Sequence, residues 1–365
     1  MKLAIVGTGL MGASVALAAR ARGHEARGYD PDPEALAAAV ARGAVTAAAT
    51  LEEAVADADI CVVAAPIAHL PGQVVAVLEA TGDRTTVTDV GSTKGSVVAA
   101  AGSSGRFVGG HPICGSESRG AEHASAGLFD GATWFLTPTA DTDPERHRLL
   151  HGLVVELGAT PVAIDAQAHD RLVALTSHAP HVLANVVANH AGSTRIDGHE
   201  PLANAGGSLR DMTRIAGANP RIWVDIFLDN ADALREALAE QRRRLEQVEA
   251  ALERRDAGFL ARWIGEAGQN RRRMLEREYP DPGALQRLRV HVPDRPGVLA
   301  GITQALGAER INIEDFELGH MSPERGGTLS VLVTGEAEAA RAAELLEGQG
   351  YGVVVSAVLD ESGDQ

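Results

Sequence analysis

Residues 2–12 read KLAIVGTGLMG, an apolar strand-like run that passes directly into a glycine-rich one, and a helical stretch follows. This order predicts a loop that binds a pyrophosphate. The first glycine makes the tight turn, the second lets the phosphates approach the backbone, and the third lets helix and strand pack closely. The unpaired N–H groups and the dipole at the helix start favour the phosphate charge. The predicted cofactor-binding residues of this loop are Gly7, Thr8, Gly9, Leu10, Met11 and Gly12.

Asp30 stands at the end of the next predicted strand, Glu25–Tyr29. A carboxylate at this position accepts hydrogen bonds from the ribose hydroxyls of an adenosine, and it repels a 2′-phosphate. The residues that follow, Pro31–Pro33, offer no arginine that would offset the repulsion. The cofactor expected is therefore NAD. Ala65 and Pro66 follow the third strand and are expected to border the adenosine, because ligands bind beyond the carboxyl ends of parallel strands.

The patterning divides the chain into three parts. In residues 1–165, β-rich runs alternate with alanine-rich helical stretches, which predicts an α/β, Rossmann-like doubly wound domain with a parallel sheet. In residues 166–280, apolar residues recur at spacings of three and four, so this part is expected to be all-helical. A helix-breaking run, Pro280–Gly283, then serves as a linker. Residues 287–360 combine three strand-like runs with two helices, a small α+β module.

Composition and charge limit the function classes. The 365 residues carry a formal net charge of −16, which would repel a nucleic-acid backbone, so no nucleic-acid partner is expected. The two cysteines, Cys61 and Cys114, suggest neither a disulfide framework nor a cysteine-based metal site. No stretch is as long and apolar as a membrane span, and no leader precedes the first strand. We therefore expect a cytoplasmic protein without a membrane partner.

His111 follows a strand and is the leading candidate for chemistry. When an alcohol is oxidised, its proton must go to a base that titrates near neutrality, and imidazole is the natural one. A structural role for such a histidine is the alternative. An arginine between two helices could hold a substrate carboxylate through paired hydrogen bonds. Arg210 and Arg214 are the candidates, and spacing alone does not choose between them.

A helix expected over Arg171–His190 contains Pro180 in its interior, where proline deletes a hydrogen bond and kinks the helix. His178 and His181 belong to a polar stripe on this helix. The stripe either bonds to neighbouring helices or forms a substrate wall, and His181 is the expected substrate contact because it adjoins the proline. A metal site is not expected, since these histidines have no third ligand at a usable spacing.

Together these motifs make the chain resemble the bacterial prephenate dehydrogenases of tyrosine biosynthesis over nearly its whole length. The motifs are the glycine run with Asp30, Asp89–Gly95, His111–Glu117, Ser177–His181, and Arg210–Ala216 followed by Trp223–Ile226. The resemblance implies NAD-dependent oxidation of prephenate with loss of carbon dioxide to give 4-hydroxyphenylpyruvate. It also implies that the helical part forms a homodimer. The alternatives are an arogenate dehydrogenase, which acts on the corresponding amine, and a non-catalytic amino-acid sensor on a cofactor-binding scaffold.

The resemblance also implies roles for individual residues. His111 would accept a hydrogen bond from the ring hydroxyl, and Ser92 would touch the same hydroxyl. Arg214 would bind a substrate carboxylate. His181, Ser116 and Glu117 would complete the substrate pocket.

The last part of the chain resembles an ACT domain through Val292–Leu299 and Arg310–Ile313. ACT domains bind small amino acids between strand and helix ends, and the resemblance, joined to the logic of the pathway, implies feedback by tyrosine. A purely dimerising module is the alternative, because fold alone does not fix function. The expected effector-binding residues are Asp294, Arg295, Pro296, Gly297, Asn312 and Ile313.

Overall fold

The structure of the protein is a computed structural model, which describes residues 1–114, 118–279, 281–322 and 326–359. Two predicted substrate-binding residues, Ser116 and Glu117, lie outside the described residues. Contacts within the chain group it into two compact units, Met1–Arg243 and Arg244–Gln365. The three-domain division expected from the sequence stays a prediction.

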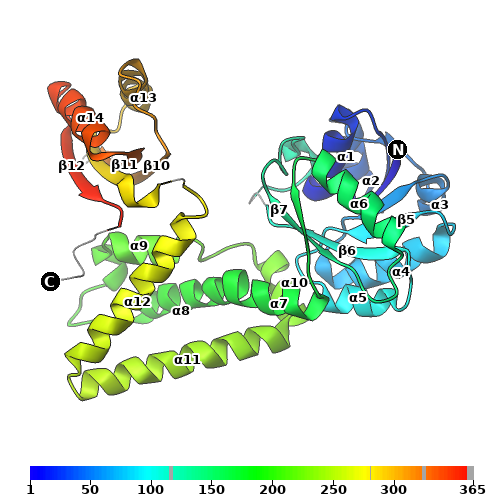
Figure 1. The fold of residues 1–365 in the computed structure, drawn as a ribbon, viewed down its shortest axis with the longest axis horizontal. Coiled ribbons are helices and arrows are strands. Elements are labelled where there is room, and N and C mark those ends of the chain that lie inside the picture. Colours follow the sequence, from blue (N-terminus) through cyan, green and yellow to red (C-terminus); the bar gives the residue numbers. More distant parts are fainter. Residues whose placement is uncertain (115–117, 280, 323–325, 360–365) are drawn as a thin grey trace. The chain divides into compact units, whose positions relative to one another are not determined.

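An eight-stranded sheet forms the centre of the first unit, with the strand order β3-β2-β1-β4-β5-β6-β7-β8 (Figure 1). Its strands are β1 Lys2–Val6, β2 Glu25–Tyr29, β3 Thr46–Ala47, β4 Ile60–Val63, β5 Thr86–Asp89, β6 Phe107–Pro112, β7 Thr133–Thr137 and β8 Thr160–Ala163. Strands β1 to β6 are parallel to one another. The residues that follow β1, β2, β4, β5 and β6 therefore meet at one edge of the sheet. The Rossmann-like fold expected from the sequence is confirmed.

The pairing of β7 corrects the expectation of a wholly parallel sheet, because β7 runs antiparallel to β6. A parallel neighbour is usually reached through a crossover helix. The described part of the β6–β7 connection contains only the short 3-10 turn η2, Ala121–His123. The chain is parallel again from β7 to β8, which α6 connects.

Helices cover both faces of this sheet, because side chains alternate along each strand. Leu3 and Ile5 pack with α1, α2 and α6 on one face, while Ala4 and Val6 pack with α3, α4 and α5 on the other. The helices are α1 Leu10–Ala21, α2 Pro33–Ala41, α3 Leu51–Val55, α4 Leu70–Ala80, α5 Gly95–Ala101 and α6 Pro144–Glu156. The two faces thus hold two separate apolar cores.

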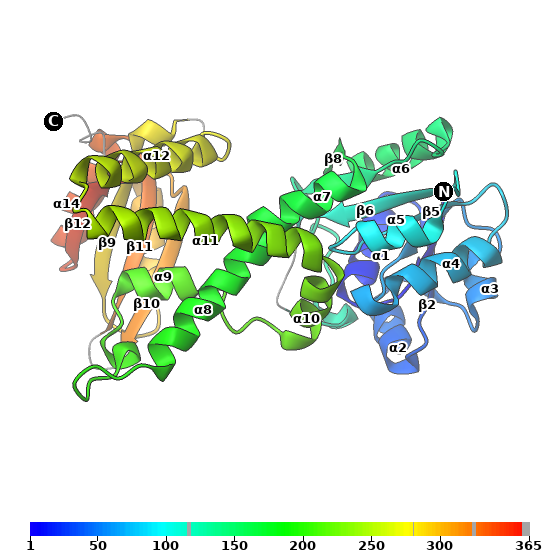
Figure 2. The same ribbon diagram turned by 90° about the horizontal axis from the view of Figure 1, so that it is seen from below.

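The chain then becomes helical, as expected from the spacing of apolar residues. Its elements are α7 Ala166–Val173, the π turn η3 Ala174–His178, α8 Ala179–Ser193, η4 Pro201–Asn204, α9 Gly207–Thr213, α10 Pro220–Asp229 and α11 Ala231–Glu253. Figure 2 shows α7 continuing into α8. The irregularity expected at Pro180 takes the form of the π turn before it, so the proline falls in the first turn of α8. The π turn accommodates the proline, which has no backbone N–H to donate. Helix α10 packs against η1, Ile67–His69, which follows β4.

The second unit contains α12, Ala257–Leu275, and a four-stranded antiparallel sheet in the order β10-β11-β9-β12. Its other elements are η5 Pro282–Ala284, β9 Leu285–Val292, α13 Val298–Ala308, β10 Asp315–Ser322, β11 Gly326–Thr334, α14 Glu336–Gly348 and β12 Gly352–Ala357. Helices α13 and α14 pack on one face around a single apolar core. Strand β10 has too few apolar residues to be recognised by pattern, and its pairing with β11 defines it. No described helix is long and apolar enough to cross a membrane.

Candidate functional site

The glycine loop after β1 has the shape that a dinucleotide requires. Gly7 has φ +94°, and a Cβ atom there would lie 2.5 Å from the carbonyl oxygen of Ala64. A Cβ on Gly12 would overlap the carbonyl oxygen of Gly7, so both positions exclude other residues. A Cβ on Gly9, in contrast, meets nothing within 4 Å among the described residues. The open space lies at the start of α1, where no described side chain caps the free N–H groups.

Asp30 lies beside this loop at the end of β2. Its Oδ2 accepts hydrogen bonds from the backbone N–H of Thr8, 2.6 Å away, and from the Thr8 hydroxyl, 3.2 Å away. Its Oδ1 accepts from the backbone N–H of Asp32 at 3.0 Å. The half-buried carboxylate is thus held at the position where ribose hydroxyls follow the phosphates. The loop, the uncapped helix start and this carboxylate fit NAD. Ala65 and Pro66 lie between β4 and η1, next to the carbonyl of Ala64 that bounds Gly7.

A buried ion pair joins the ends of β5 and β6. Lys94 Nζ donates to Asp89 Oδ2 and to the carbonyl oxygen of Gly110, the latter at 2.9 Å, and both charged side chains are 0% exposed. Asp89 Oδ1 in turn accepts from the Gly110 N–H at 3.0 Å, and Oδ2 accepts from the Gly91 N–H at 2.8 Å. Desolvation lowers the pKa of Lys94, while Asp89 opposes this shift. The pair fixes the loop on which the half-buried Ser92 lies.

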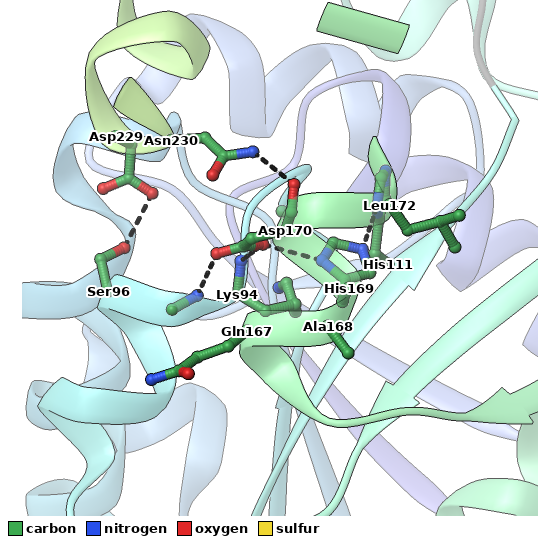
Figure 3. A network of polar contacts seen from close by, with 12 residues as sticks. Lys94, Ser96, His111, Gln167, Ala168, His169, Asp170, Leu172, Asp229 and Asn230 are labelled. Carbon is green, nitrogen blue, oxygen red and sulfur yellow. Dashed lines mark hydrogen bonds and ion pairs between the residues drawn. The ribbon is translucent and has the colours of Figure 1, made fainter. Parts of the chain in front are cut away.

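His111 lies within β6 rather than after it, because the strand extends past it and pairs it with Phe135 of β7. Its Nδ1 lies 2.8 Å from Nε2 of His169 (Figure 3). Desolvation, together with the nearby His169, Lys94 and His178, holds the pKa of His111 well below its ordinary value. The imidazole is therefore neutral at neutral pH and can accept a proton.

His169 connects His111 to a carboxylate. His169 is fully buried, and its Nδ1 lies 2.8 Å from Asp170 Oδ1. The same oxygen accepts from the backbone N–H of Lys94 at 2.8 Å, and Asp170 Oδ2 accepts from that of Gly95 at 2.7 Å. Burial acts to raise the pKa of Asp170, but the hydrogen bonds from His169 and the two amides outweigh it and lower the pKa. Figure 3 shows the continuous line of side chains.

The histidines around Pro180 meet side chains from α10 and its end. Buried His178 has its Nδ1 3.2 Å from Asn230 Nδ2, and burial lowers the pKa of His178 to about 4. The His181 ring stacks on Trp223, with ring centroids 3.5 Å apart. Asn230 also donates to the backbone carbonyl of Asp170 at 2.8 Å, which connects these rings to the group around His111.

Arg214 stands at the end of α9 and is exposed, as is Arg210. Helix α9 packs against α8, and the Gly217 N–H that follows it donates to Asn185 Oδ1 of α8 at 3.1 Å. The loop is therefore attached to the helix that carries His181. Among the described residues, no hydrogen bond joins either arginine to His111, so the choice of Arg214 stays a prediction.

Sequence reasoning did not single out Lys94, His169, Asp170, Trp223 or Asn230. Lys94 and Trp223 stand inside the motifs that carry the resemblance, and a lysine in an otherwise apolar, glycine-rich stretch is a signal of a buried pair. His169 and Asp170 follow the helix-capping Asp165 in α7. Their spacing in the sequence does not distinguish them from polar residues on a solvated helix face. Among the described residues, no group of three metal-ligating side chains comes together.

In the second unit, the predicted effector residues lie around the start of α13 and the start of β10. Gly297 is the N-cap of α13 with φ +88°, a conformation that favours glycine. Asn312 donates to Glu314 Oε1 at 2.9 Å. A cavity of about 230 Å³ opens between α13 and the sheet, and Ile313 is the predicted effector residue that lines it. Asp294, Arg295 and Pro296 form the turn that precedes the helix.

Comparisons with known proteins identify the family. Residues 15–163 match the family described as "Prephenate dehydrogenase, nucleotide-binding domain", residues 165–266 its "dimerization domain", and residues 286–350 the ACT domain. The prephenate dehydrogenase of Bacillus subtilis is 31% identical, over 94% of this chain and 95% of the relative. Among solved structures, Synechocystis arogenate dehydrogenase has a TM-score of 0.69 and 30% identity, over 74% of this chain and 99% of that one. Aquifex aeolicus prephenate dehydrogenase in complex with hydroxyphenyl propionate and NAD+ has a TM-score of 0.70 and 28% identity, over 75% of this chain and 98% of that one. The chain belongs to the prephenate dehydrogenase family.

Proposed function

We propose that this chain is an NAD-dependent oxidoreductase that converts prephenate to 4-hydroxyphenylpyruvate and carbon dioxide. The observation that carries the proposal is the pairing of a glycine loop and Asp30, which fit NAD, with a neutral, half-buried His111 at the same edge of the sheet. Family membership supports the substrate, and the NAD+ bound to the Aquifex aeolicus relative supports the cofactor.

The reaction needs a hydride acceptor, a base and a site that holds two carboxylates. Bound NAD supplies the hydride acceptor. As the ring carbon loses hydride, the hydroxyl oxygen becomes a carbonyl and shares its proton with the neutral ring of His111. The ring carboxylate then leaves as carbon dioxide, and the electrons of its bond make the ring aromatic. The proton returns to the phenolate oxygen, so one hydride and one carbon dioxide leave for each substrate and no net proton is released.

The remaining predicted residues belong to binding. We assign Ser92 to the ring hydroxyl, Arg214 to a substrate carboxylate, and His181, Ser116 and Glu117 to the pocket wall. Arg214→Ala should raise KM at least about tenfold with a smaller effect on kcat, because a charged hydrogen bond contributes roughly 1.5–3 kcal/mol. Arg210→Ala, on the same helix and equally exposed, is the matched control and should leave KM unchanged. The opposite result would move the anchor to Arg210.

Arogenate is the second candidate substrate, because an arogenate dehydrogenase is among the similar structures. Steady-state NADH production from prephenate and from arogenate, each with NAD and NADP, decides between them. The proposal predicts a higher kcat/KM for prephenate with NAD. Turnover of arogenate alone would assign the other activity, and turnover of neither would favour the non-catalytic sensor.

Tyrosine is the proposed effector of the ACT domain. The turn before α13, the left-handed Gly297 and the adjoining cavity beside Ile313 support a small-molecule site. Tyrosine should lower the rate and raise the melting temperature of the intact protein, since a ligand stabilises the state it binds. Unchanged rate and melting temperature would leave the module as a dimerising one.

A homodimer is the proposed assembly. Large apolar side chains that are more than half exposed recur through the helical part, at Leu175, Val186, Leu228, Leu245 and Ile264. Exposed apolar surface that is contiguous marks protein–protein contact, and these side chains are its candidates. Light scattering on the purified chain should give twice the monomer mass of 38.0 kDa, and the monomer mass would contradict the proposal.

The cytoplasm is the proposed compartment. Cys61 and Cys114 are both free, and burial raises their pKa values to about 12 and about 11. Such thiols are inert, as suits a protein that uses no disulfide. Fractionation of the producing cells should recover the activity with the cytoplasmic proteins.

A further inference from the structure

We propose that His169 and Asp170 select the tautomer of His111, so that its Nε2 is always the free, proton-accepting nitrogen. His169 and Asp170 are positioning residues, because they act on the substrate only through His111. The inference rests on the proposed function for its catalytic meaning, while its physical content, the place of one proton, can be tested without substrate.

The selection starts at the carboxylate of Asp170. Its two oxygens accept from the backbone amides of Lys94 and Gly95, at 2.8 Å and 2.7 Å, and from the ring of His169 at 2.8 Å. The lowered pKa of Asp170 agrees with an ionised group, which has no proton to donate. Nδ1 of His169 must therefore carry the hydrogen in this contact.

The rest follows from the fact that a neutral imidazole has one N–H and one lone pair. We take His169, like His111, as a neutral ring, so the proton on its Nδ1 leaves the lone pair on its Nε2. The 2.8 Å contact then requires His111 to donate from Nδ1. His111 is neutral, so its remaining nitrogen, Nε2, has the lone pair. In water the Nε2–H form is the commoner one, and the contacts therefore reverse the ordinary preference.

Burial makes the arrangement obligatory. His169 is 0% exposed, and the Phe135 ring lies against it with centroids 5.4 Å apart, so bulk solvent does not reach the ring. The backbone of Asp170 is held by Asn230, and Asp170 itself by the start of α5. The charged and titratable groups around the two rings are Asp89 at the end of β5, Lys94 after that strand, His178 of the π turn, and Asp229 at the end of α10.

The arrangement suits the proposed proton movement. The ring hydroxyl gives its proton to Nε2 of His111, which becomes an imidazolium with Nδ1 still donating to His169. The Asp170 charge, one ring away, stabilises that cation, as the aspartate does in a Ser-His-Asp triad. No proton has to pass through His169, because the proton on Nε2 returns to the product.

The test is nitrogen NMR of the full-length protein labelled with ¹⁵N-histidine, at neutral pH and without ligand, with the His111 signals assigned by their loss in His111→Asn. We expect a protonated Nδ1 and an unprotonated Nε2 in His111, and the same pattern in His169. A proton on Nε2 of wild-type His111 would overturn the inference. This measurement uses the wild-type protein, so it does not depend on whether a variant of His169 or Asp170 folds.

Two variants then separate tautomer selection from support of the fold. In Asp170→Ala His169 Nδ1 loses its acceptor, so the ordinary tautomer preference should return and Nε2 of His111 should carry the proton in most molecules. We expect kcat of Asp170→Ala to fall at least about 100-fold with KM changed less than about threefold, because loss of the correct tautomer in a serine-protease triad costs about 10,000-fold. His169→Gln keeps one donor and one acceptor and should retain most of kcat and the tautomer of His111.

The controls keep the two proposals distinguishable. His151→Gln, at an exposed position of α6, should change neither the tautomer nor kcat. An unchanged His111 tautomer in a folded Asp170→Ala protein that still binds NAD would overturn the inference. Failure of the wild-type protein to oxidise prephenate would overturn the proposed function. The NMR result would still decide whether His169 and Asp170 select the tautomer of His111.

Discussion

The carboxylate of Asp30 and the backbone of Thr8 are in direct contact, with Oδ2 2.6 Å from the Thr8 nitrogen. Asp30, which would accept hydrogen bonds from the ribose, is thus fixed against the glycine loop that would bind the phosphates. Asp30→Asn keeps a hydrogen-bonding oxygen and removes the charge, so the NAD:NADP ratio of kcat/KM should fall about 10–100-fold. Asp32→Asn, which alters only the cap of α2, is the control and should leave the ratio unchanged. An unaltered ratio in the Asp30 variant would remove Asp30 from cofactor selection.

Two of the loop glycines, Gly9 and Gly12, should respond differently to alanine. Gly9→Ala adds a Cβ atom into open space with an ordinary φ of −68°, so the protein should fold normally and bind NAD weakly, because the methyl group enters the phosphate space. Gly12→Ala overlaps the carbonyl of Gly7 and should lower the melting temperature itself. Calorimetry and NAD titration of both variants check this. Normal NAD affinity in Gly9→Ala would contradict the assignment of the loop.

The buried pair Lys94–Asp89 should matter far more for stability than the exposed pair Lys2–Asp57. Lys94→Met leaves a buried carboxylate without its cation, and the cost for such a change is about 3–5 kcal/mol. Lys2→Met removes a pair whose side chains are about half exposed, so the melting temperature should barely change. Thermal unfolding of the two variants makes the comparison. Equal shifts would mean that the buried pair is not ionised as described.

Stability should decline in mild acid. The pKa of His178 is about 4 in the folded protein and ordinarily 6.5, so the unfolded chain binds the proton more tightly. The fold is most stable with His178 neutral. This contribution to the free energy of unfolding is complete above pH 6.5 and is lost as the pH falls towards 4, by up to about 3 kcal/mol. His111, whose pKa is also lowered, acts in the same direction. Melting temperatures across this range should fall, and the fall should be smaller in His178→Gln. A variant that retains the full wild-type pH dependence would exclude His178 as a cause.

Local patterns predicted much of the fold and the cofactor loop. The glycine run, the alternating strands and the end-of-strand Asp30 are each contained within about thirty residues, and their meaning follows from local geometry. The antiparallel β7 and the strand β10 escaped prediction, because pairing partners, not local patterns, decide both.

The chemical group around His111 could be predicted only in part. His111 itself was recognised, but His169 and Asp170 lie about sixty residues further along the chain and reach it only because α7 packs against β7 and α5. Long-range contacts between polar side chains leave no periodic signal. The π turn before Pro180 likewise depends on the helix as a whole and not on the proline alone.

The stoichiometry of a single reaction tests the central claim most directly. Purified full-length protein is mixed with prephenate and NAD, and NADH, carbon dioxide and 4-hydroxyphenylpyruvate are measured together, for the wild type and for His111→Asn. The account predicts one carbon dioxide and one 4-hydroxyphenylpyruvate for each NADH, and a His111→Asn kcat that falls far more than KM changes. NADH without carbon dioxide, or a His111→Asn protein with wild-type kcat, would contradict it.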